Sequence, residues 1–164
     1  MYAKITILSL ATSILVWFSA CKDDDQERGI IPVEQVSKAF AEKYPNARTV
    51  VFEIEGKYYV ADFTNEGYPV TAWFTDQGQW VMEKIEYPFG RLPQKVTAAF
   101  LESEYGDWEI EECYEINRAG METVYKIEVQ KGEKERNLYY SSSGNLIKAG
   151  EEDKNGDQPM LWLP

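Results

Sequence analysis

The feature that most constrains the fold is a segment that occurs twice, about 60 residues apart. The first copy reads IPVEQVSKAFAEKYPNA and the second reads LPQKVTAAFLESEYGDW. The matched positions are apolar or aromatic in both copies: Val36 with Val96, Ala39 with Ala99, Phe40 with Phe100, and Tyr44 with Tyr105. Self-similarity of this kind predicts two related structural units in one chain.

Each copy has the spacing of an amphipathic helix. Val36, Ala39 and Phe40 share one helical face under the i, i+3, i+4 rule, and their counterparts in the second copy do the same. Pro32 and Pro93 stand where a helix begins, and Pro45 or Gly106 ends the pattern. Each segment therefore predicts a short helix with one side to bury.

After each helix the apolar period changes to two, which is typical of strands. The turn signals Glu55-Gly56, Asn65-Glu66-Gly67 and Asp76-Gln77-Gly78 separate the strands of the first copy. The predicted strands are 48–55, 57–64, 69–75 and 79–86, then 108–117, 122–131, 134–141 and 145–149. The fold class expected is α+β, a tandem repeat of a helix followed by a four-stranded antiparallel meander sheet, with units at 30–91 and 92–150.

Residues 151–164 form a C-terminal tail that follows the second unit. Its end, QPMLWLP, is similar to YPFGRLP at residues 87–93, the entry to the second unit. Trp162 and Leu163 lead us to expect that the tail folds back over apolar surface, and a frayed terminus is the alternative.

The N-terminal residues have the pattern of a targeting signal. Residues 1–20 place an apolar stretch behind Lys4, too short to span a bilayer. Phe18-Ser19-Ala20-Cys21 resembles the bacterial lipobox, although Leu or Val is usual at the position of Phe18. We expect a lipoprotein signal peptide at 1–20, lipidation of Cys21 and an acidic tether at 21–29. An ordinary cleaved signal and an uncleaved anchor are the alternatives.

Lys22-Asp23-Asp24-Asp25 resembles the lysine-and-acid signal that sends some Gram-negative lipoproteins to the cell surface. We expect attachment to the outer membrane through lipid alone, at the surface, with the periplasmic face as the alternative. The formal net charge of −11 repels phosphate backbones, so nucleic acid is an unsuitable partner.

The order of a helix, a four-stranded meander and the same again resembles the PepSY-like family of bacterial secreted lipoproteins, whose fold is related to β-lactamase inhibitory protein. The resemblance covers about residues 30–150 and rests on this pattern and on the Leu-Pro-x-x-Val-x-x-Ala-Phe start of the second copy. It implies a pair of sheets, each with a helix on one face, and a role in binding or inhibiting another protein. It brings no catalytic residues.

Little in the sequence favours catalysis, a metal or a cofactor. Histidine, the commonest general base, is absent. Asp153 to Asp157 start like a calcium loop, but the loop glycine and final glutamate do not follow. The acids at 109, 111, 112 and 115 alternate with apolar residues as on a solvated strand, and Cys113 is expected to be a buried free thiol. We therefore expect a protein that is not an enzyme.

The aromatic residues give the best functional hint. If the first helix covers one side of its sheet, Tyr58, Val60, Thr71 and Trp73 point to the other side. An exposed patch with Trp and Tyr is typical of an interaction surface, whereas cover by the other unit or by the tail would bury the same side chains. We expect a binding module for a secreted or envelope protein, with glycan or small-ligand binding as the alternative.

Overall fold

The computed structural model describes residues 29–151. Each half of this range begins with a helix and continues as a meander. In chain order the elements are α1 (Glu34–Lys43), β1 (Arg48–Glu55), β2 (Tyr58–Asn65), β3 (Tyr68–Phe74), β4 (Trp80–Glu86), the short 3-10 helix η1 (Phe89–Arg91), α2 (Gln94–Leu101), β5 (Glu109–Arg118), β6 (Val124–Lys131), β7 (Lys134–Ser141) and β8 (Leu146–Gly150). The predicted helices and strands are all present, with ends that shift by a few residues.

The strands form one antiparallel sheet in the order β1 to β8, and this corrects the expected pair of sheets. The join is made by β4 and β5, whose register runs from Met82 opposite Arg118 to Glu86 opposite Tyr114. Two separate sheets would leave the hydrogen-bonding groups of both strands unpaired at an edge. Pairing the two edges satisfies those groups, so the halves share a single sheet.

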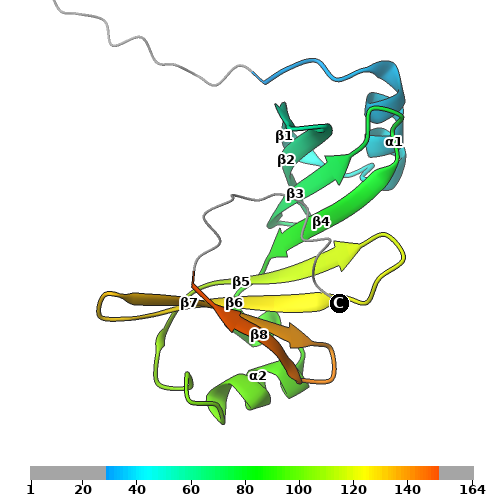
Figure 1. Cartoon of the computed structure of the whole chain (residues 1–164). Helices are drawn as coiled ribbons and strands as arrows, with labels where there is room; N and C mark the ends of the chain where they lie inside the picture. The colour runs from blue at the N-terminus through cyan, green and yellow to red at the C-terminus, as the bar shows by residue number, and fades with distance from the viewer. Residues whose placement is uncertain (1–28, 152–164) are drawn as a thin grey trace, which may run out of the picture.

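Both helices pack on the same face of this sheet, each over its own half (Figure 1). Val36 and Phe40 of α1 contact a cluster that includes Phe63 and Phe74, while Val96 and Phe100 of α2 contact one that includes Ile127. Phe40 meets the Phe63 ring edge to face, with centroids 5.0 Å apart. The other face of the sheet carries no helix of the described chain and is called here the helix-free face.

The last hairpin of each half is fixed to its helix in the same way. Gly78 has a φ of +78° and its Cα lies so close to α1 that an added Cβ would be 2.5 Å from the carbonyl oxygen of Gln35. Gly144, with a φ of +88°, approaches the carbonyl oxygen of Lys95 in α2 with the same 2.5 Å. Only glycine combines this backbone conformation with such a close approach.

The sheet ends at β1 on one side and at β8 on the other. On the β1 side the chain before α1 adds one bond, from the Ile30 N–H to the Phe52 carbonyl at 2.7 Å. A bulge interrupts the pairing between Arg48 and Val51, where Thr49 has a φ of 54°. Exposed apolar side chains collect on this edge: Ile30, Ile31, Val33, Val50, Val51 and Ile54.

Within residues 29–151, no helix is both long and apolar enough to cross a membrane. The predicted signal peptide, Cys21 and nearly all of the tether lie outside the described residues, as does the tail from residue 152 onwards.

Candidate functional site

A row of paired aromatic and basic side chains crosses the helix-free face from β5 to β8. Tyr114 lies opposite Lys126, Lys126 opposite Tyr139, and Tyr139 opposite Lys148. Residues directly opposite on neighbouring strands project to the same side and contact one another. The row therefore alternates aromatic rings and ammonium groups over four strands.

The lysines of this face lie over the tyrosine rings. The Lys126 Nζ is 5.5 Å from the centroid of Tyr114, and the Lys148 Nζ is 5.8 Å from that of Tyr139. From β4, the Lys84 Nζ approaches the Tyr114 ring to 4.7 Å. These separations fall within the range of cation–π attraction, which fixes the rings and the charges relative to one another.

Two carboxylates complete the row on the side nearest the start of β5. The Tyr114 hydroxyl donates a hydrogen bond to Glu112, and Lys126 forms an ion pair with Glu128. Burial raises the pKa of the Tyr114 phenol, and its bond to Glu112 raises the pKa further. Tyr114 therefore stays a neutral hydrogen-bond donor at physiological pH.

The four residues predicted as a binding surface all lie on the helix-free face, because Val60 pairs with Trp73 and Thr71 with Asp62. Val60 and Trp73, however, are fully buried, in a cluster with Met82, Ile116 and Tyr139. Of the two states that the sequence left open for these side chains, the structure has the buried one. The continuous sheet brings apolar residues of both halves into one cluster, and Val60 and Trp73 lie inside it.

Tyr58 and Thr71 remain partly exposed at the border of that cluster. The Thr71 hydroxyl donates to Asp62 at 2.7 Å, and the indole N–H of Trp73 donates to Glu55 at 3.1 Å. The four predicted residues thus form one continuous region, with a buried base and a partly accessible border.

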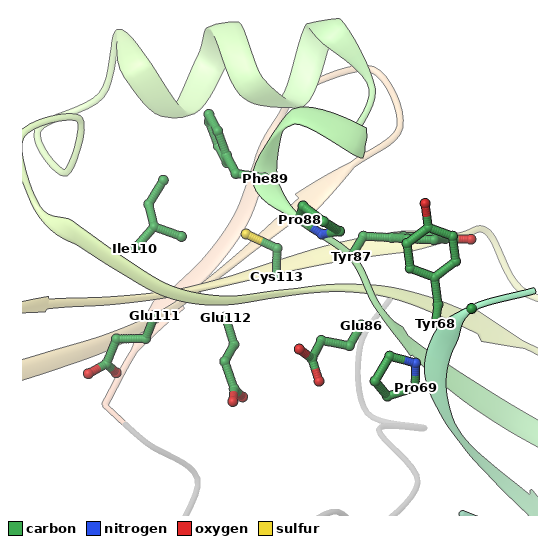
Figure 2. Close-up of a pocket in the computed structure, with 11 residues that line it drawn as sticks. Tyr68, Pro69, Glu86, Tyr87, Pro88, Phe89, Ile110, Glu111, Glu112 and Cys113 are labelled. Atoms are coloured by element: carbon green, nitrogen blue, oxygen red, sulfur yellow. The ribbon is translucent and has the colours of Figure 1, made fainter. Parts of the chain in front are cut away.

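A cavity of about 510 Å³ lies where the two halves meet, between the β2–β3 turn, the end of β4 and the start of β5. Figure 2 shows the carboxylates of Glu86, Glu111 and Glu112 on one side of β5, with Ile110 and Cys113 on the side of α2. Glu111 and Glu112 are consecutive yet point the same way, because a bulge interrupts the β5–β6 pairing between Ile110 and Glu112. The bulge gathers acidic groups at the cavity.

Tyr68 and Tyr87 form the other wall of the cavity, with ring centroids 4.6 Å apart and planes at 75° (Figure 2). Partial desolvation and the neighbouring acids Glu135 and Glu128 raise the pKa of Glu111. This arrangement attracts cations and polar ligands, yet no group of three or more potential metal-binding side chains occurs between residues 29 and 151.

Glu111 and Glu112 lie together at the cavity, but the other acids of β5 do not all join them. Glu115 projects to the helix side, opposite Ile85, whereas Glu112 lies on the helix-free face. Cys113 is a buried free thiol, as predicted, and burial raises its pKa to about 12. A thiol with so high a pKa is a poor nucleophile at neutral pH.

Sequence reasoning missed the row formed by Tyr114, Lys126, Tyr139 and Lys148. The alternation in each strand marks which residues share a face of that strand. It does not say that β5 pairs with β4 or which residues stand opposite one another. The register is needed to see the row, and a single sequence does not supply it.

Comparison with known proteins agrees with this architecture. A family model described as "Putative beta-lactamase-inhibitor-like, PepSY-like" matches residues 17–66 and 57–148. No curated protein matches the chain.

Three solved Bacteroides structures share the fold. A BLIP-like protein of B. fragilis is 28% identical, with a TM-score of 0.75, covering 84% of this chain and 100% of that one. A DUF2874 family protein of B. ovatus is 26% identical, with a TM-score of 0.76 and coverage of 83% and 100%. A B. eggerthii structure described with the words "putative periplasmic proteins" is 23% identical, with a TM-score of 0.71 and coverage of 74% and 90%.

The family match spans most of the sequence and agrees with the single eight-stranded antiparallel sheet and its two helices. The chain therefore belongs to the PepSY-like, β-lactamase-inhibitor-like family of proteins.

Proposed function

We propose that this protein is a non-enzymatic binding module of the bacterial envelope and that its helix-free face binds another secreted or envelope protein. The observation that carries the proposal is a partly accessible border of aromatic and polar side chains on the side of the sheet away from both helices: Tyr58, Thr71, Lys84 and Lys148. Inside this border, Tyr114, Lys126 and Tyr139 are buried and hold the face in shape. Tyrosine is enriched at protein interfaces because its ring offers a large contact area at little entropic cost.

The family supports a binding role, since it is named for likeness to a β-lactamase inhibitor. A fold does not fix a function, so the proposal depends on the chemistry of the face. The partly exposed Tyr58 and Thr71 supply contacts at its border, and Val60 and Trp73 form its rigid base.

The proposed cellular location follows from the N-terminal sequence. Removal of residues 1–20 and lipidation of Cys21 would attach the protein to the outer membrane, with the tether to residue 29 separating it from the lipid. Metabolic labelling with a tagged fatty acid tests this assignment. Label on the wild type and its loss in Cys21→Ser are expected, and equal labelling of both would refute lipidation at this residue. Protease treatment of intact cells then tests surface display.

Residues 30–91 and 92–150 are proposed to be two copies of one unit. The proposal is supported by structural details that both units share, rather than by sequence identity between them. Both last hairpins are closed by corresponding backbone bonds, from Gly78 to Thr75 and from Gly144 to Ser141, each 2.9 Å long. Both also have a register shift at corresponding positions, at Phe74 and Tyr140.

Site-specific photo-crosslinking in the bacterial host tests the binding surface. A photoreactive phenylalanine analogue replaces Tyr58 or Thr71 in the full chain. The matched controls carry it at Lys38 or Glu42, both solvent-exposed on α1 at the other face. A discrete protein adduct from the two sheet positions, and none from α1, is expected.

The same adduct from all four positions, or from none, would overturn the proposed protein-binding face. A charge-reversal variant, Lys84→Glu, should reduce the adduct without changing the circular dichroism spectrum. Equal expression of all variants is the control for folding.

A second candidate function, glycan binding, is favoured by the cavity in Figure 2. Tyr68 and Tyr87 offer ring faces, and Glu86 offers a hydrogen-bond acceptor beside them. Trp73 cannot stack on a sugar because it is buried. A glycan array that gives a signal lost in Tyr68→Ala and kept in Tyr58→Ala would select this function over protein binding.

A further inference from the structure

Several side chains of the helix-free face are buried although both helices pack on the other face. Val60, Trp73 and Met82 are 0% exposed, and Tyr139 is 1% exposed. A sheet covered on one side only normally keeps contact with water on its other side. The burial of these four residues indicates that this side is covered as well.

We infer that residues 152–164 dock across the helix-free face as an intramolecular ligand. This segment begins where β8 ends. Gly150 lies opposite Asn137, a buried residue of the helix-free face. Glu151 pairs at 3.5 Å with Arg136, which lies on the helix side, opposite Val129. The chain therefore leaves the sheet at its β8 edge, from which the segment has to turn onto the helix-free face.

The length of the segment is sufficient. From β8 to β3 there are five strand spacings of about 4.8 Å, so Trp73 lies roughly 24 Å away across the sheet. Thirteen extended residues span up to about 43 Å. Residues 160–163 can therefore reach the cluster around Trp73 with slack for curvature.

The chemistry of the segment also fits the face. Met160, Leu161, Trp162 and Leu163 form an apolar run, which suits the cluster of Val60, Trp73 and Met82. The residues before this run are acidic: Glu152, Asp153 and Asp157. They would pass Lys148, Lys126 and Lys84, which lie along the same face from β8 to β4. Opposite charges at the border and apolar contacts at the centre are typical of a specific interface.

A docked tail would compete with an external partner for this face. That consequence rests on the proposed function, but the docking itself does not. A partner would have to displace the tail, and its affinity would fall in proportion to the fraction of protein whose face is open.

Disulfide trapping within one chain tests the docking. In residues 22–164, Leu163→Cys is combined with Thr71→Cys on the helix-free face or, as the control, with Lys38→Cys on α1. Cys113, the remaining cysteine, is buried. A docked tail holds the first pair close together, whereas a free tail samples both pairs at similar effective concentrations. The intrachain bond is expected to form at least about tenfold faster for the Thr71 pair.

Equal rates for the two pairs would overturn the inference. A bond whose yield rises with protein concentration would overturn it too, because the tail would then occupy a second copy. Trp162→Ala and, separately, Lys148→Glu should slow trapping of the Thr71 pair, with the circular dichroism spectrum as the folding control. No slowing in either variant would refute the proposed contacts.

Trapping and photo-crosslinking separate the two proposals. Fast trapping without any partner adduct would retain the docked tail and reject the protein-binding function. A partner adduct without preferential trapping would retain the protein-binding function and reject the docked tail. If both hold, Trp162→Ala should raise the yield of the partner adduct from Tyr58, and an unchanged yield would reject competition.

Discussion

Replacement of Gly78 by alanine should destabilise the first half through its contact with α1. The added Cβ would lie 2.5 Å from the carbonyl oxygen of Gln35 and 2.9 Å from its carbonyl carbon. Both are backbone atoms of a helix, so neither can rotate away. The helix and the hairpin must separate by roughly 1 Å, which loosens the packing of the helix on the sheet.

The expected decrease in the free energy of unfolding has two parts. A left-handed backbone conformation costs an alanine about 1–2 kcal/mol. Forced separation of packed elements adds about 1–3 kcal/mol. Gly67 provides the matched control, because its φ of +88° is similar and no atom lies within 4 Å of an added Cβ. Gly67→Ala should therefore show the first cost alone.

Urea unfolding, followed by circular dichroism, measures the difference. For a domain of this size, each molar of urea reduces the free energy of unfolding by about 1–3 kcal/mol, so an excess of 2 kcal/mol shifts the midpoint by roughly 1 M. Gly144→Ala, against the control Gly132→Ala, should repeat the result in the second half. If Gly78→Ala and Gly67→Ala have the same midpoint, the reasoning from close approach is wrong.

Three further outcomes are expected. Tyr44→Phe should reduce the free energy of unfolding in urea by about 1–3 kcal/mol. The Tyr44 hydroxyl donates to Glu83 at 2.5 Å and accepts from the indole N–H of Trp80 at 3.0 Å, and the variant loses both bonds. A loss below about 0.5 kcal/mol would contradict this expectation. Cys113, in residues 22–164, should not react with a disulfide reagent at pH 8 until urea unfolds the chain, since its pKa is about 12; rapid reaction in buffer would show an accessible thiolate. Burial raises the pKa of the Tyr44 and Tyr114 phenols above the ordinary 10.0, so the unfolded chain loses these protons first. Their stabilisation is complete below pH 10 and decreases above it, which urea midpoints at pH 9 and 11 and absorbance at 295 nm will check; Tyr114→Phe should remove one late-titrating phenol.

Most of the local structure could be predicted because its signals are local. Helical spacing around Val36 and Phe40, and turn pairs such as Glu55-Gly56, depend on neighbours in the chain. The buried state of Cys113 was expected for a different reason, because a free cysteine behaves as a small apolar residue. The exact ends of the helices are harder to predict. Pro32 lies before the N-terminal cap of α1, whereas Pro93 is itself the cap of α2.

The site depended on information that is not local. The pairing of β4 with β5 is favoured because it satisfies the hydrogen-bonding groups of two strand edges. Neither strand contains a sequence signal that predicts this pairing. The same pairing determines that Trp73 contacts residues of both halves. The sequence could therefore identify the face of Trp73 but not its exposure, and it gave no sign that Tyr114 and Lys126 stand opposite one another.

The join between β4 and β5 has a consequence for the ends of the sheet. If the halves are copies, β8 corresponds to β4 and β1 to β5, so the β8 edge of one molecule matches the β1 edge of the next. Such a head-to-tail contact does not close on itself and would grow into a fibre. The bulge at Thr49 and the bond from Ile30 to the Phe52 carbonyl interrupt the β1 edge. The short segment before α1 thus covers part of the edge at which such growth would begin.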